Sequence, residues 1–206
     1  MSKTTIPTGG IADDAVGNTK LDLTANYAFT GTVTGAAQDF AHITDTNAAG
    51  ASYVEFTSIG SYKNYVIWGR DINLSADTSL YLTYYIGGTR QTSGYRWRSK
   101  SFKDDGNDES SNTQSANEIL VGKDFDNASS SKNQLTIWFS QLTGTTTEPS
   151  LYFENSGKMS NGTFCRTIGF GTSVSSSSGV VSGFRIHTGS GTYTTASFSL
   201  YGVATS

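Results

Sequence analysis

The chain has 206 residues and a formal net charge of −3, with 12% aromatic and 15% charged residues, 23 glycines and only 2 prolines. This length suits one β domain of full size with an N-terminal appendage. The weak negative charge and the lack of a recurrent basic stripe exclude nucleic acid as a natural partner, and no apolar run is long enough for membrane insertion. The first residues lack the apolar core of a signal peptide, so we expect a soluble product made in a cytoplasm. Cys165 is the only cysteine, which excludes an internal disulfide.

The first fifty residues differ in pattern from the rest of the chain. Their apolar residues are small and widely spaced, too few to build a core. Such a stretch becomes ordered by lying on another surface, whether its own domain, a sister subunit or a larger assembly. One short strand is expected within 25–33, and Ala36–Ala51 is expected to be a linker. We therefore divide the chain into an extended arm with linker, 1–50, and a β domain, 51–206.

From Ser52 onward, short runs alternate apolar and polar residues, as half-buried strands do. The longest such run is Tyr62–Leu74. Its inward residues are predicted to be Val66, Trp68, Ile72 and Leu74. Arg70 falls on the same face, which predicts a bulge, a bend or a paired arginine there. In the next run the inward residues are predicted to be Leu80, Leu82, Tyr84 and Ile86, with Tyr81 and Tyr85 outside.

The middle of the chain combines short strands with polar stretches. Tyr95–Arg98 reads as a strand, whereas Phe102–Asn117 contains almost nothing apolar and is predicted to be a long exposed loop. A second loop is expected at Asn127–Asn133. The following run alternates Leu135, Ile137 and Phe139 with Thr136, Trp138 and Ser140, so Trp138 should face outward. Cys165 sits at an alternating position, where a half-buried structural thiol is expected.

The end of the chain carries two more alternating runs. Phe184 and Ile186 are predicted to face inward, with Arg185 and His187 on the other side. Phe198 and Leu200 should face inward in the last run. We expect this last strand to be tied into its sheet rather than frayed.

The runs amount to about nine or ten strands, with no sustained helical spacing. This pattern predicts an all-β fold, an antiparallel β-sandwich with an extended N-terminal arm. Several connections are long, as connections between sheets must be, so a jelly-roll-like arrangement is favoured.

No motif for catalysis or metal binding emerges. His42 and His187 are the only histidines, and neither a Ser-His-Asp order nor a zinc spacing can be assembled with them. The acidic run Asp104–Glu109 does not match a calcium loop and has no apolar neighbours to raise a carboxyl pKa, so it reads as a solvated loop. We expect no catalytic residue, no metal ligand and no cofactor.

Two segments resemble proteins of bacteriophage particles. Ile6–Leu21 reads IPTGGIADDAVGNTKL, which resembles the start of many tail-fibre and virion appendage proteins. Ala196–Val203 reads ASFSLYGV, which is similar to the Ser-Leu-Tyr-Gly-Ile close of a β-sandwich module of phage fibres and decoration proteins. The resemblance implies a non-enzymatic virion structural protein, a fibre or decoration protein of capsid or tail. It also implies a homotrimer with an N-terminal anchor and a C-terminal jelly roll, made in the host bacterial cytoplasm and located in the virion.

The implied partners are copies of the chain itself and other virion proteins. The candidate anchoring residues of the arm are Ile6, Ile11, Val16, Leu21, Leu23 and Phe29. An alternative function is attachment to a host cell-surface glycan through the loops Phe102–Asn117 and Asn127–Asn133, and a polysaccharide depolymerase is less favoured. The outward aromatics proposed for subunit packing or glycan contact are Tyr81, Tyr85, Tyr95 and Trp138, with subunit packing preferred.

Overall fold

The computed structural model describes residues 40–140, 142, 148–173 and 180–203. The expected arm lies outside these residues, together with its candidate anchoring side chains Ile6, Ile11, Val16, Leu21, Leu23 and Phe29. The described residues form thirteen strands and no helix. The strands are β1 (Phe40–Asn47), β2 (Tyr53–Phe56), β3 (Asn64–Leu74), β4 (Thr78–Ile86), β5 (Thr89–Arg90), β6 (Tyr95–Lys103), β7 (Glu109–Ala116), β8 (Ile119–Phe125), β9 (Asn133–Ser140), β10 (Ser150–Lys158), β11 (Phe164–Ser173), β12 (Val181–Thr188) and β13 (Tyr193–Val203).

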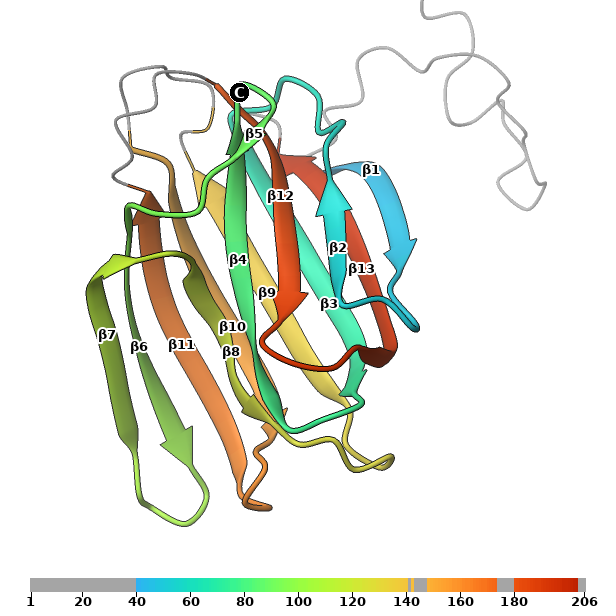
Figure 1. Ribbon diagram of the computed structural model, residues 1–206, viewed down its shortest axis with the longest axis vertical. Helices are drawn as coiled ribbons and strands as arrows, with labels where there is room; N and C mark the ends of the chain where they lie inside the picture. Colours follow the sequence, from blue (N-terminus) through green and yellow to red (C-terminus); the bar gives the residue numbers. More distant parts are fainter. Residues whose placement is uncertain (1–39, 141, 143–147, 174–179, 204–206) are drawn as a thin grey trace, which may run out of the picture. The chain divides into compact units, whose positions relative to one another are not determined.

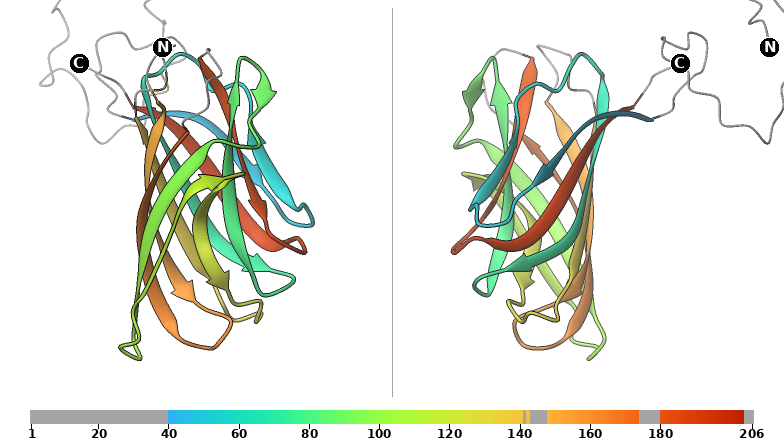
Figure 2. Two further views of the ribbon diagram at one scale, coloured as in Figure 1. Left: turned by 60° about the vertical axis from the view of Figure 1, so that its left-hand side comes forward. Right: turned by 90° about the vertical axis from the view of Figure 1, so that its right-hand side faces the viewer.

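The strands form two antiparallel sheets that lie face to face (Figures 1 and 2). The large sheet has the order β1-β13-β3-β9-β10-β11-β6-β7, so β1 and β7 are its edges. The small sheet has the order β2-β12-β4-β5, and β8 also pairs with β4. The prediction of an all-β antiparallel sandwich is confirmed.

The strand order is that of a jelly roll with two insertions. Eight strands make the jelly roll: β1-β13-β3-β9 in one sheet and β2-β12-β4-β8 in the other. The beginning of this unit thus pairs with its end, as two nested Greek keys require. The inserted strands β10, β11, β6 and β7 continue the large sheet beyond β9, and we call these four strands the extension.

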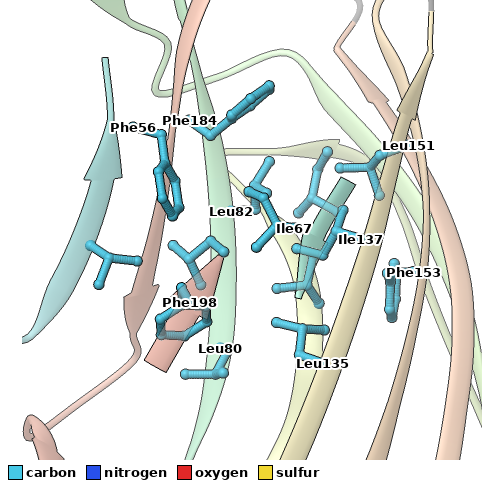
Figure 3. Packing of buried hydrophobic residues seen from close by; sticks show 14 of the residues in the cluster. Phe56, Ile67, Leu80, Leu82, Leu135, Ile137, Leu151, Phe153, Phe184 and Phe198 are labelled. Atoms are coloured by element: carbon cyan, nitrogen blue, oxygen red, sulfur yellow. The ribbon is translucent and has the colours of Figure 1, made fainter. Parts of the chain in front are cut away.

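The core lies between the two sheets, where every second residue of each strand turns inward. Figure 3 shows these side chains meeting from both sheets, among them Phe56, Leu80, Leu82 and Phe184 from the small sheet and Ile67, Leu135, Ile137, Leu151, Phe153 and Phe198 from the large one. The predicted inward faces of β4, β9, β12 and β13 are confirmed, because their apolar residues are buried. β13 pairs with β1 on one side and β3 on the other, so the last strand is tied in as expected.

β3 changes face within its length. Its first half buries Tyr65 and Ile67 in the core and turns Trp68 outward, which is opposite to the prediction for Val66 and Trp68. The pairing with β9 shifts between Gly69 and Ile72, and Asp71 has a φ of 53°. This is the bulge predicted around Arg70. Because a bulge adds one residue to the strand, Ile72 and Leu74 return to the core.

Two segments expected to lack structure are strands. Phe40–Asn47, within the predicted linker, is β1 and pairs with β13, so Gln38–Ser206 forms one compact unit. Most of the predicted loop Phe102–Asn117 is a hairpin, because β6 continues to Lys103 and β7 begins at Glu109. β7 is an edge strand whose only apolar residue is Ala116, so its sequence gives no periodic signal.

Candidate functional site

The outer face of the large sheet, which is turned away from the small sheet, carries most of the exposed aromatic surface. Nine large hydrophobic side chains are exposed among the described residues, and seven of them lie on this face. They are Phe40, Trp68, Phe102, Trp138, Tyr152, Phe164 and Phe170, and between 37 and 61% of each is open to solvent. A concentration of apolar side chains on one face marks an interaction surface rather than chance exposure.

The strand register aligns several of these residues into one row across the sheet. Trp138 is paired with Val66 on one side and with Tyr152 on the other. Tyr152 is paired with Phe170, which is paired with Arg98. Because neighbouring strands lie about 4.8 Å apart, the three aromatic residues stand side by side in one row that ends at an arginine.

The jelly-roll half of this face is apolar. Phe40, Trp68, Trp138 and Tyr201, which we call the aromatic cluster, surround the buried Val66. The ring centre of Phe40 lies 6.1 Å from that of Trp68 and 6.0 Å from that of Trp138, and the rings of Trp68 and Tyr201 are 4.7 Å apart. These contacts hold the indole rings in place on the sheet.

The extension half is basic and hollowed. Arg96, Arg98 and Lys100 are alternate residues of β6 and all point outward. A hollow of about 240 Å³ lies against Arg98, Lys100, Ser110, Tyr152, Ile168 and Phe170. A second hollow of about 540 Å³ lies against Arg96, Arg98, Asn112, Gln114, Phe170 and Thr172. Arg98 and Phe170 line both hollows, so the two lie side by side, and we call them together the depression.

The outer face of the small sheet differs because its charges are already paired. Arg185 donates to Glu55 from Nε at 2.6 Å and stacks on the ring of Tyr53, whose centre is 4.1 Å away. The hydroxyl of Tyr85 also donates to Glu55. Burial tends to raise the pKa of Glu55, but these hydrogen bonds outweigh it and leave the pKa lowered. This face therefore offers fewer free groups to a partner.

The four predicted contact aromatics do not gather in one place. Trp138 is on the outer face of the large sheet, as predicted. Tyr81 and Tyr85 point outward from β4, in the small sheet, and are partly buried. Tyr95 is fully buried, so its predicted outward position is wrong. Its hydroxyl accepts a hydrogen bond from the backbone of Tyr84 at 2.9 Å and donates to Gln91 O at 3.1 Å, and burial raises its pKa to about 12.

Sequence reasoning missed Phe40, Trp68, Tyr152, Phe164 and Phe170 as exposed aromatics. A usable signal exists for Phe170, which stands between Gly169 and Gly171. A β-carbon on Gly171 would lie 2.8 Å from Ile119, and one on Gly169 would meet Phe153 and the backbone of Arg98. The two inward positions therefore have no room for a side chain, and the large ring between them must point outward.

Glu109 lacks the properties of a catalytic general acid. Glu109 lies between Lys103 and Lys123, whose hydrogen bonds lower its pKa to about 2. A general acid at neutral pH needs the opposite shift. The two histidines lie on different sheets, His42 on β1 and His187 on β12, and burial raises the pKa of the Cys165 thiol. The described residues contain no cluster of three or more potential metal ligands and no helix fit to cross a bilayer.

No protein-family model, curated protein or solved structure matches this chain.

Proposed function

We propose that this chain is a non-enzymatic structural protein of a bacteriophage virion, a fibre or decoration protein that works as a homo-oligomer. The observation that carries the proposal is the aromatic cluster on the jelly-roll half of the large sheet. The resemblance of Ala196–Val203 to phage modules supports it, because this segment belongs to β13, between β1 and β3 in the jelly roll. The arm within 1–50 contacts other virion proteins in this proposal.

The size of the cluster suits the centre of a subunit contact. Phe40, Trp68 and Trp138 are 40, 37 and 41% exposed. At about 200 Å² per aromatic side chain, they leave about 240 Å² of apolar surface open on each subunit. Burying that surface is worth about 6 kcal/mol per subunit before the entropy of association is subtracted. Aromatic residues of this kind dominate interface centres, while a polar rim supplies the remaining area.

Glu109 is unsuited to the general-acid role in a depolymerase, because its pKa is lowered to about 2. A depolymerase would instead need a carboxyl group kept protonated near neutral pH and a second carboxylate about 5–9.5 Å from it. We expect that the protein releases no reducing sugar from host polysaccharide.

The oligomer is tested by exchanging Trp68 and Trp138 for serine together and measuring the mass in solution by light scattering across a concentration series. The unchanged protein should run as an oligomer, with a trimer expected, and the double variant as a monomer. Tyr53→Ser is the matched control, because Tyr53 is 44% exposed but lies on the small sheet. A monomeric unchanged protein, or a double variant of unchanged mass, would contradict the proposed contact.

A further inference from the structure

We infer that the depression on the extension binds an acidic saccharide, with the sugar ring on Phe170 and its carboxylate on Arg98. This inference goes beyond the proposed subunit contact and does not depend on it, because the aromatic cluster lies on β1, β13, β3 and β9. The depression lies on β10, β11, β6 and β7, strands that are not among the eight of the jelly roll.

The positive charge of the depression favours an anionic ligand. Arg96, Arg98 and Lys100 point outward from β6 at intervals of about 7 Å, because each strand residue adds about 3.4 Å. Within the described part of the chain, Arg96 and Arg98 form no ion pair, while Lys100 Nζ lies 3.4 Å from Asp108 Oδ2. A guanidinium group presents paired N–H donors that match a carboxylate. Arg98 supplies such unused donors at the wall of both hollows, and Arg96 supplies them at the wall of the second.

The aromatic side chains favour a ligand with a flat, partly apolar face. Phe170 is 61% exposed and Tyr152 is 44% exposed, and the two residues are directly paired across β11 and β10. A pyranose ring has one face of C–H groups that packs on an aromatic ring, and its edge carries hydroxyls. Phe170 also lines both hollows, so a ring placed on it lies beside Arg98.

The far wall of the depression supplies groups that suit sugar hydroxyls. Asn112 and Gln114 are exposed on β7 and line the second hollow, and Ser110 lines the first. Neither amide side chain has a hydrogen-bond partner among the described residues, and each offers both a donor and an acceptor. Three cations on one strand of a chain with a net charge of −3 are too few for a nucleic-acid track. A carboxylated sugar can contact all three kinds of group: the cations with its carboxylate, the aromatic rings with its C–H face, and the amides with its hydroxyls.

The test is calorimetric titration of the full chain, in whatever oligomeric state it has, with a hexamer of galacturonic acid. The fully methyl-esterified hexamer has the same backbone without the charge. Arg98→Gln removes the central cation, and Phe170→Ala removes the ring. Lys63→Gln is the matched control, because it removes an exposed cation outside the large-sheet face. Light scattering of each protein, measured in the same buffer, keeps this result separate from the subunit contact.

The acidic hexamer should bind, and the esterified hexamer should bind at least about tenfold more weakly, as expected for the loss of a charge-assisted hydrogen bond. Arg98→Gln should weaken binding by a similar factor, Phe170→Ala by about fivefold, and Lys63→Gln not at all. Binding that is absent, that is equal for the two hexamers, or that Arg98→Gln leaves unchanged would overturn the inference. Inorganic phosphate that competes at the same concentration as the hexamer would also overturn it, because the sugar would then contribute nothing.

Discussion

Replacing Phe184 with alanine tests how the two sheets are held together. Phe184 lies on β12 in the small sheet and is fully buried. Its ring stacks on Phe139 of β9 with 4.1 Å between ring centres, and it meets Tyr65 of β3 edge-on at 5.8 Å. It also contacts Tyr84 of its own sheet at 6.0 Å. One side chain therefore connects the small sheet to two strands of the large one.

The cost follows from these contacts. Truncating a fully buried phenylalanine to alanine costs about 3–5 kcal/mol, because transfer free energy is lost and a cavity remains. Each aromatic pair adds about 0.5–1.5 kcal/mol beyond its area, although these terms do not add fully. We expect the free energy of unfolding to fall by about 4 kcal/mol, a large share of the 5–15 kcal/mol of a typical domain. Phe184→Leu keeps most of the volume and should cost about 1–2 kcal/mol.

The assay is urea unfolding followed by tryptophan fluorescence, with Phe170→Ala as the control. Phe170 is a phenylalanine in a central strand of the large sheet, but its ring points outward, so the control should lie within about 0.5 kcal/mol of the unchanged protein. A loss below about 1 kcal/mol at Phe184, or an equal loss at Phe170, would refute the assignment of inner and outer faces. Such a result would indicate a different register, because a slip of one residue turns every side chain of a strand to the opposite face.

Two further predictions concern buried polar groups and acid stability. Asn133 is fully buried, donates to Ile72 O at 3.1 Å and accepts from the backbone of Lys158 at 3.0 Å, so Asn133→Ala should cost about 2–4 kcal/mol in the same urea assay. A loss below about 1 kcal/mol would show that water replaces the amide. The pKa of Glu109 is lowered from 4.5 to about 2. The ionised Glu109 therefore stabilises the fold fully above pH 4.5, and this stabilisation is lost as the pH falls to about 2. As the pH is lowered between those two values, the melting temperature of Glu109→Gln should therefore fall less than that of the unchanged protein. Parallel curves of melting temperature against pH would contradict this.

The inward faces of several strands were predictable because alternation continues without interruption along them. Leu80, Leu82 and Tyr84 follow each other at every second position, and the core holds all three. β3 shows the limit of this reasoning. A pattern read through Trp68 and Ile72 places both on one face, but the bulge between Gly69 and Ile72 puts them on opposite faces.

Other elements were not predictable because their residues carry no burial signal. β7 has the sequence ESSNTQSA and is held by its backbone pairing with β6 at the edge of the sheet. Tyr95 was predicted to face outward, although Arg96 and Arg98 occupy the opposite face of the same strand. In fact the arginines are the outward residues, and the hydroxyl of Tyr95 is tolerated in the core because it is hydrogen-bonded on both sides.

The candidate site was only partly predictable, because it arises from register rather than from any one strand. Trp138, Tyr152, Phe170 and Arg98 come from four strands and meet only when β9, β10, β11 and β6 are paired. Three of these strands are outside the jelly roll, whose eight strands already bring the two ends of the domain together. Added strands increase the outer surface without being needed for that closure. Their outward residues are therefore free to be aromatic and basic, which is where the depression with Arg98 and Phe170 lies.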